Sequence, residues 1–419
     1  MKADIKRTVF NFLKIFDKRS KIMIAAIGIY NWASSLPSQF SQLYITALGA
    51  DALQLGSLNS IGGIAYCIFS APMGLFIDRF GVKTAIILGL VLSAIVSGIY
   101  SSASNWLMLI PAMIFSQISF RMLYSLPDLV LIEEAKPEKR AQAMSFARTV
   151  WSIPSIIAPV IAAAIVVAYG GITTEGIRPL YIIQTIFTLF IIFFIFFVME
   201  NRHRKFVNIE STLERGNFIE GFKDLFKGEK WLKEWTIAMS LFYFASSVSV
   251  SYVPLWMVNV VKADAYILGI VSTTGIIMST LLQIPVGRMA DKIGRKKAFY
   301  LLRPITYAGT FLLLFAPTPE SLILVGIMGA VGMMQGLNSI CWIPFTTMYW
   351  ELVPTEKRGR WFGFTGIFNT LVTIPAFMLG GFLWQIGQME LVILLPIIIE
   401  LLGVIPVLVR IPDTLDRSG

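Results

Sequence analysis

Long apolar stretches alternate with short polar segments along the whole chain. A helix needs roughly 20 apolar residues to cross the ~30 Å hydrocarbon layer of a bilayer. The pattern supplies six such stretches in each half, so we expect an all-α membrane protein with twelve transmembrane helices. The expected spans are residues 23–48, 54–77, 84–104, 106–132, 142–169, 179–199, 235–260, 266–287, 298–317, 321–349, 362–385 and 390–410.

Composition supports the membrane assignment. Of the 419 residues, 56% are hydrophobic and 14% are charged, and the mean hydropathy is +0.72. Water-soluble globular chains of this length are less apolar. The two cysteines, Cys67 and Cys341, fall inside expected spans, so the sequence indicates neither a disulfide framework nor a metal site. No cofactor is expected.

Basic residues gather on one side of the expected membrane. With the N-terminus in the cytoplasm, all of the 35 lysines and arginines except Arg121, Arg178 and Lys262 lie at the cytoplasmic level. The positive-inside rule predicts this bias, so we expect a multi-pass protein of the cell membrane with both termini in the cytoplasm. The net charge of +10 then indicates contact with anionic lipid, and no nucleic-acid partner is expected.

The two halves of the chain repeat one sequence pattern. Residues 50–85 align with residues 263–298, and residues 133–140 match residues 351–358. Repeats of this length indicate two homologous half-domains, and an even number of spans gives both halves the same orientation. The expected domains are an interfacial N-terminal helix at 1–22, a six-helix bundle at 23–199, a cytoplasmic linker with an amphipathic helix at 200–234, a second six-helix bundle at 235–410 and a cytoplasmic tail at 411–419.

Charged motifs follow the second and eighth spans and carry a family resemblance. They read GLFIDRFGVK at residues 74–83 and GRMADKIGRKK at residues 287–297. Their aspartates, Asp78 and Asp291, are expected to pair with Arg140 and Arg358 or with helix N-termini. Both motifs resemble the G-x-x-x-D-[RK]-x-G-[RK]-[RK] signature of the major facilitator superfamily (MFS).

That resemblance covers nearly the whole chain and implies two pseudo-symmetric six-helix bundles with a gate on the cytoplasmic side. The alternative is that the motif charges only anchor loops at the headgroup level. The implied gating residues are Gly74, Asp78, Arg79, Gly81, Glu133, Arg140, Gly287, Asp291, Gly294, Arg295, Glu351 and Arg358.

Three ionisable residues stand out inside the expected spans, where charges are costly and usually functional. Arg121 lies about 18 Å from the end of its span at ~1.5 Å per residue, and the resemblance places the fourth span on the central cavity. We expect Arg121 to contact an anionic or hydrogen-bond-accepting substrate, with a buried structural partner as the alternative. Asp128 and Glu400 are candidate proton carriers. Asp128 equally fits the gate, and Glu400 equally fits a hydrogen bond between helices.

Other polar and aromatic residues fall on the first, seventh and tenth spans. Aromatic faces with a few hydrogen-bonding groups suit an amphipathic organic ligand, although each residue singly also fits helix packing. The substrate-binding candidates beside Arg121 are Asn31, Gln39, Gln42, Tyr243, Tyr252, Trp256, Gln335, Asn338 and Trp342.

The resemblance implies a secondary active transporter that works by alternating access. No Walker-type motif occurs, so a proton gradient is the expected energy source. Efflux of amphipathic or anionic compounds is the leading hypothesis, and uptake or facilitated transport of a sugar or organic anion is the alternative. A membrane receptor or enzyme is a remote alternative, because no histidine cluster, H-E-x-x-H or G-x-S-x-G motif occurs. The expected partners are a small-molecule substrate, a proton and membrane lipid, and a monomer is sufficient.

Overall fold

A computed structural model describes residues 18–134, 140–198, 230–333, 335–353 and 358–413. Within these ranges it leaves out the side chains of residues 18–20, 71, 74–75, 77–78, 124–134, 140–149, 198, 230, 349–350, 358–360 and 362–363. The described residues form helices and no strands, which confirms the all-α fold class.

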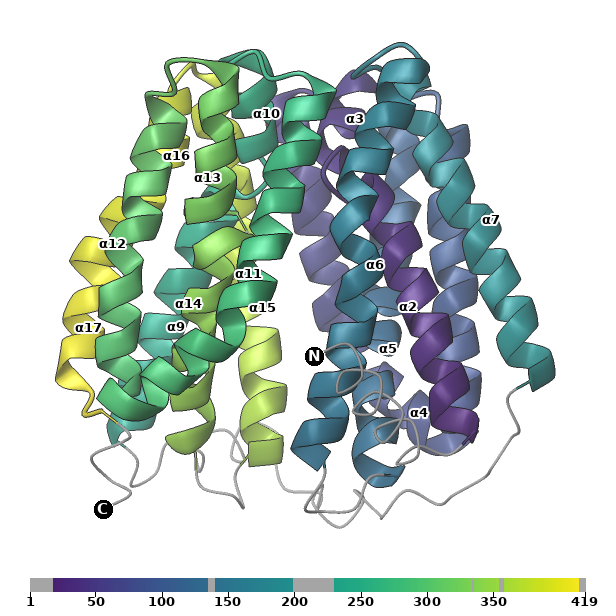
Figure 1. Cartoon of the computed structure of the whole chain (residues 1–419), viewed down its shortest axis with the longest axis horizontal. Coiled ribbons are helices and arrows are strands. Elements are labelled where there is room, and N and C mark those ends of the chain that lie inside the picture. The colour runs from purple at the N-terminus through teal and green to yellow at the C-terminus, as the bar shows by residue number, and fades with distance from the viewer. Residues whose placement is uncertain (1–17, 135–139, 199–229, 334, 354–357, 414–419) are drawn as a thin grey trace, which may run out of the picture. The chain divides into compact units, whose positions relative to one another are not determined.

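One compact unit, the N-terminal unit, combines Met1–Gln39 with Ile68–Val207. Its helix α2 packs against both α6 and α7 (Figure 1). The core of this unit holds branched and sulfur-containing side chains, among them Met23, Ile86 and Met122, with the ring of Trp151 against them. Its elements are α2 (Lys18–Ser38), the part of α4 (Ala52–Ser102) from Ile68 on, η1 (Trp106–Met108), α5 (Leu109–Glu134), α6 (Arg140–Ala168) and α7 (Thr174–Val198).

The other compact unit, the C-terminal unit, combines Phe40–Cys67 with Asn208–Gly419. Its helix α14 packs against α11 and α12 (Figure 1), and Trp235, Phe299 and Phe345 lie in its core. Its elements are α3 (Ser41–Ala47), the first part of α4, α9 (Lys230–Ser249), α10 (Val253–Asn259), α11 (Ala265–Ile293), α12 (Arg295–Leu314), η4 (Pro319–Ser321), α13 (Leu322–Met328), α14 (Gly336–Glu351), α15 (Arg358–Gln385), α16 (Met389–Ile399), η6 (Glu400–Val404) and α17 (Ile405–Arg410).

The helices follow the expected spans closely. In the described part of the chain, nine helical stretches are long and apolar enough to cross a membrane. The other three expected spans hold α2 with α3, α12, and α13 with α14. A total of twelve crossings, the side of the termini and the domain boundaries stay predictions, and most of the expected linker and of the N-terminal helix lies outside the described residues.

Several expected spans are irregular rather than straight. In α4, Gly81 has φ 81° and ψ 166°, so the helix bends between the second and third spans. The seventh span breaks between Ser249 and Val253. The tenth breaks between α13 and α14, and the twelfth contains the π-helical turn η6. Two of these irregularities, in the tenth and twelfth spans, meet at one cluster of buried polar side chains.

Candidate functional site

The break in the tenth span is built on glycine. α13 ends at Met328 and α14 begins at Gly336. Gly329, Gly332 and Gly336 have φ angles of 71°, 89° and 60°, a backbone region that glycine enters without steric cost. At membrane depth, irregular backbone is tolerated only where protein buries it or where it lines a water-filled cavity. The break is therefore a candidate functional element.

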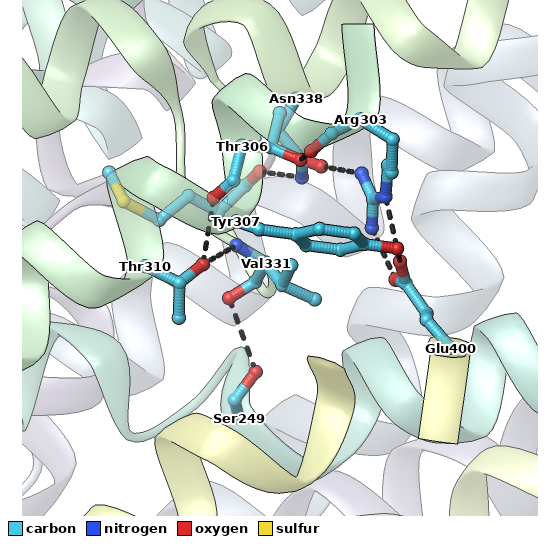
Figure 2. A network of polar contacts seen from close by, with 9 residues as sticks. Ser249, Arg303, Thr306, Tyr307, Thr310, Val331, Asn338 and Glu400 are labelled. Atoms are coloured by element: carbon cyan, nitrogen blue, oxygen red, sulfur yellow. Dashed lines mark hydrogen bonds and ion pairs between the residues drawn. The ribbon is translucent and has the colours of Figure 1, made fainter. Parts of the chain in front are cut away.

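Neighbouring helices supply hydrogen-bond partners to the backbone of the break (Figure 2). The Val331 N–H donates to Thr310 Oγ1 at 2.9 Å, and Ser249 Oγ donates to the Val331 carbonyl at 3.5 Å. The Asn338 side chain donates through Nδ2 to the Met333 carbonyl at 2.5 Å. Because these buried groups are paired, α9, α12 and α14 all hold the break in its bent shape.

An ion pair lies beside the break, between Arg303 of α12 and Glu400 of η6. Both side chains are only 1% exposed. Arg303 Nε donates to Glu400 Oε2 at 2.7 Å, and its Nη2 donates to Oε1, so the guanidinium grips the carboxylate with two parallel bonds. Its third nitrogen, Nη1, donates to Asn338 Oδ1. The Tyr307 hydroxyl donates to Glu400 Oε2 at 3.0 Å.

Aromatic rings surround the guanidinium. The Arg303 Cζ atom lies 5.0 Å from the ring centroid of Phe242, 5.5 Å from that of Tyr307 and 5.9 Å from that of Phe299. Such cation–π contacts favour the charged form of an arginine that water does not reach. The three rings and Glu400 therefore enclose the Arg303 guanidinium, and the adjacent Glu400 carboxylate neutralises its charge.

Burial of this pair is costly, and the cost needs an explanation. Removing a carboxylate and a guanidinium from water is repaid only when the geometry is good and the remaining donors are used. Here Glu400 accepts from Arg303 and Tyr307, and Arg303 also reaches Asn338. Charged groups inside membrane spans are rare and mostly functional. The network is therefore the strongest candidate site among the described residues.

The π turn determines where Glu400 lies. The Ile405 N–H donates to the Glu400 carbonyl, five residues back, instead of to the residue four back. Pro406 follows at the start of α17 and has no N–H to give to the preceding turn. π turns inside α-helices are frequent at functional sites, and this one begins at the residue that carries the buried carboxylate.

Arg303 is the site residue that the sequence analysis misses. The charge pattern assigns it to the cytoplasmic level with the lysines and arginines just before it, and the structure adds that its side chain is buried among helices. Its place within the expected span 298–317, one turn before Tyr307, is a signal that could have found it. By contrast, Glu400 is one of the predicted residues, and its hydrogen bond to another helix is one of the two roles considered for it.

The second charged motif forms its own ion pairs. Arg295 Nη1 lies 2.6 Å from Asp291 Oδ1, and Arg295 Nη2 lies 3.2 Å from Glu351 Oε1. Arg295 thus links the end of α11 to the end of α14. The side chain of Arg358, the expected partner of Asp291, lies outside the described residues. A Cβ at Gly287 would have no atom within 4 Å, so packing does not explain that glycine.

A carboxylate near the C-terminal end of the described chain caps α12. Asp413 accepts from the backbone N–H groups of Arg295 and Lys296, both at 3.1 Å. Gly294, the residue before α12, has φ 104°, and a Cβ there would collide with Asp413 Oδ2. Lys296 Nζ donates to the carbonyls of Val409 at 2.9 Å and Ile411 at 2.8 Å. Burial lowers the pKa of Lys296, and the charge of Asp413 opposes that shift.

Comparison with known sequences decides the family. The profile of the Major Facilitator Superfamily matches residues 22–347 and residues 235–418. The chain belongs to the major facilitator superfamily. It is therefore a multi-pass membrane protein of a transporter family rather than of an enzyme family. No curated protein sequence matches it.

Solved structures of MFS transporters share the fold of this MFS chain. A D-xylose–proton symporter superposes with a TM-score of 0.69 at 14% identity, covering 94% of this chain and 98% of that one. A mutant of the nucleoside transporter NupG gives a TM-score of 0.72 at 14% identity, covering 93% and 98%. An inward-facing bacterial homologue of the human lysosomal transporter Spinster gives 0.61 at 12% identity, covering 87% and 81%. At these identities the likeness establishes the fold alone.

Two predicted substrate ligands of this MFS protein point into protein. The Tyr252 hydroxyl donates to the carbonyls of Ala52 at 3.0 Å and Phe377 at 3.3 Å, and its side chain is fully buried. The Trp256 indole Nε1 donates to the Leu313 carbonyl at 3.0 Å. Their hydrogen-bonding groups are used by backbone, so in this state they pack helices together.

Other predicted ligands keep unused polar atoms. In the C-terminal unit, Gln335 donates to Ser272 Oγ at 3.4 Å while its buried Oε1 has no hydrogen bond among the described atoms, and the same holds for Trp342 Nε1. Trp342 stands among the rings of Phe242, Tyr243 and Phe345.

In the N-terminal unit, Gln39 donates to the Pro159 carbonyl at 3.0 Å, and its buried Oε1 also has no hydrogen bond among the described atoms. Asn31 and Arg121 are half-buried on α2 and α5. The side chains of Asp78, Asp128, Glu133 and Arg140, and the surroundings of Gly74, are not among the described parts of the structure. Arg79 is exposed, with its guanidinium 5.4 Å from the ring centroid of Phe80.

A further polar cluster joins the predicted residue Gln42 to two residues that the sequence analysis does not name. Asn59 of α4 donates through Nδ2 to Gln42 Oε1 at 3.3 Å and to Ser251 Oγ at 3.2 Å. Ser251 lies in the break of the seventh span, between α9 and α10. Side-chain amides thus donate hydrogen bonds to two breaks in this unit, Asn59 to that of the seventh span and Asn338 to that of the tenth.

Proposed function

We propose that this MFS protein moves a small organic solute across the cell membrane by alternating access and that proton movement drives it. The observation that carries the proposal is the buried pair of Arg303 and Glu400 at the break of the tenth span. Discontinuous helices at membrane depth form substrate and coupling-ion sites in secondary transporters, and a carboxylate held there is suited to gain and lose a proton.

Glu400 is the better-supported proton carrier of the two candidates. Its carboxylate accepts from Arg303 and Tyr307 and is shielded from solvent. A proton can reach it only after the surrounding helices rearrange. That requirement supports coupling, because the proton then crosses only as the conformation changes. Asp128 stays a second candidate.

Two solute classes follow from the two units. Arg121 in the N-terminal unit supports an amphipathic or anionic compound, moved outward, which is our leading proposal. Uptake of a neutral hydroxylated solute such as a sugar is the second candidate. It is favoured by the C-terminal unit, where Arg303 is already neutralised and two predicted ligands, Gln335 and Trp342, each keep a buried polar atom without a hydrogen bond among the described atoms. Two structural neighbours, a D-xylose–proton symporter and a nucleoside transporter, support this second candidate.

The test uses purified protein in liposomes that contain a pH-sensitive dye. Solutes of three classes, organic anions, sugars with nucleosides, and lipophilic cations, are added with and without an imposed pH gradient. Proton movement that begins only when one class is added supports the proposal and identifies the class. Solute entry with no proton movement contradicts proton coupling. Binding with neither entry nor exchange of any solute would favour a receptor.

Arg121→Ala separates the two solute classes. Loss of transport of organic anions in this variant, with sugar transport unchanged or absent, supports the anionic proposal. Full sugar transport in both proteins, without anion transport in either, overturns it in favour of the neutral solute.

A further inference from the structure

Arg303 touches two partners that lie far apart in the sequence. Through Nε and Nη2 it holds Glu400 of the twelfth span, and through Nη1 it holds Asn338 of the tenth. The other end of the Asn338 amide holds the Met333 carbonyl in the break. A continuous series of hydrogen bonds therefore leads from the carboxylate to irregular backbone (Figure 2).

The guanidinium determines which way the Asn338 amide faces. An arginine can only donate, so the amide oxygen must face Nη1, and the amide nitrogen must then face away from it. That nitrogen is the group that donates to Met333. Asn338 is 4% exposed, so water offers it no substitute partner. If Arg303 left, the amide would lose the contact that fixes its orientation.

We infer that Arg303 and Asn338 are positioning residues that hold the tenth-span break in its bent form for as long as Glu400 is ionised. The inference rests on the proposed proton coupling. When Glu400 takes up a proton, the guanidinium is left buried without its counter-charge, which is strongly unfavourable. Arg303 must then move to another acceptor and release Asn338. The released amide no longer holds Met333, and the break can change shape.

In the part of the chain that the structure describes, few other titratable groups face this carboxylate. α12 presents Arg303 and Tyr307, and α14 presents the Cys341 thiol. α9, which packs against η6, presents the Phe242 ring to Arg303 and Leu241 to Gly403. Of these groups, Glu400 and its arginine are the charged ones, so a single proton changes the balance of the whole cluster.

Cys341 provides a native reporter of the break. It lies on α14 one turn beyond Asn338 and is 1% exposed. The other cysteine, Cys67, belongs to α4 and is half-buried. In a Cys67→Ser background, the rate at which a small maleimide labels Cys341 measures how often the break opens.

The experiment compares labelling rates in proteoliposomes across pH. Glu400→Gln mimics the protonated carboxylate, and Asn338→Ala removes the link to Met333 while leaving the ion pair intact. Both are expected to label about tenfold faster than the parent at neutral pH, the effect on an equilibrium of losing ~1.4 kcal/mol. Ser339→Ala is the matched control on the same helix, because among the described residues its hydroxyl bonds to the Gly336 carbonyl alone. It is expected to label at the parent rate.

A double variant keeps the test valid if Glu400→Gln fails to fold. Arg303→Met with Glu400→Leu replaces the pair by apolar side chains, an exchange that often preserves stability. Because maleimide reacts with the thiolate, the rate at each pH is divided by that of a free cysteine at the same pH. On this scale we expect the double variant to label fast at every pH, whereas the parent labels slowly at high pH and faster as pH falls. Parent-like rates in both Asn338→Ala and the double variant overturn the inference.

The outcome is separable from that of the proposed function. Fast labelling in these variants, together with solute transport that moves no protons in the parent, leaves the positioning role standing and removes the proton coupling. Proton-coupled transport in the parent, with variants that label Cys341 at the parent rate, keeps the proton coupling and removes the positioning role.

Discussion

The cap that Asp413 places on α12 allows a quantitative prediction about Gly294. Asp413→Ala removes a carboxylate that accepts two backbone N–H groups at a helix start. The loss of a cap costs ~0.5–2 kcal/mol, and the loss of a negative charge at the helix N-terminus costs a further ~0.3–1 kcal/mol. We expect this variant to lose about 1–3 kcal/mol of unfolding free energy.

Gly294→Ala should cost more, for two reasons. At φ 104° an alanine is strained by ~1–3 kcal/mol, and its Cβ would displace the Asp413 carboxylate. The total is about 2–6 kcal/mol. Because the second contribution is the loss of the same cap, the double variant should cost clearly less than the sum of the two single variants.

The assay is equilibrium unfolding in mixed micelles with increasing SDS, followed by tryptophan fluorescence. Gly287→Ala is the matched control: its Cβ meets no atom within 4 Å and its φ lies in the helical range, so it should be neutral or slightly stabilising. Strict additivity of Gly294→Ala and Asp413→Ala would refute the reasoning, since it would mean that the carboxylate does not occupy the space left by the missing Cβ.

Three further outcomes follow from packing and pairing. Tyr252→Phe should lose about 1 kcal/mol of unfolding free energy with its hydroxyl. Gly380→Ala should lose several times more in the same SDS titration, because its Cβ would collide with the Val248 carbonyl oxygen and the Tyr252 ring. Equal losses would contradict this close approach. Arg303→Ala should lose ~3–5 kcal/mol by leaving Glu400 unpaired, and Arg303→Met combined with Glu400→Leu should recover most of it; a double variant as unstable as the single one would show that charge is not the cause. Trp256→Phe should lose about 1 kcal/mol with its hydrogen bond to the Leu313 carbonyl, seen as a lower melting temperature, and a melting temperature equal to that of the parent would argue against that bond.

Hydrophobic length predicts where the helices run, because crossing a bilayer fixes how many apolar residues each needs. The expected span 142–169 matches α6 at Arg140–Ala168, and 362–385 matches most of α15. The glycine in the first charged motif, Gly81, lies where α4 bends. These features depend on local composition, which is visible in any window of the sequence.

The candidate site depends on contacts between segments that are distant in the sequence, so only part of it could be predicted from the sequence. Glu400 was identifiable as a charge in an apolar run, but nothing near it in the sequence names Arg303 as its partner. Arg303 itself follows a basic cluster and is easily counted with it. Tyr252 carries a polar group that suggests a ligand, and only the fold reveals that Ala52 and Phe377 use it.

The π turn at Glu400–Val404 makes the length of the last span as important as its composition. A π turn accommodates one residue more than an α-helical turn closed by the same neighbours. Deleting Leu402, whose side chain is 77% exposed, removes no buried contact of its own. Its deletion would turn the bond from the Ile405 N–H to the Glu400 carbonyl into an ordinary α-helical bond, so the flanking segments would keep nearly the same faces and Glu400 would stay directed toward Arg303. Elsewhere in this span a single-residue deletion would rotate everything beyond it by about 100°, so a gap aligned to the π turn is compatible with the ion pair, whereas a gap in the regular helix on either side is not.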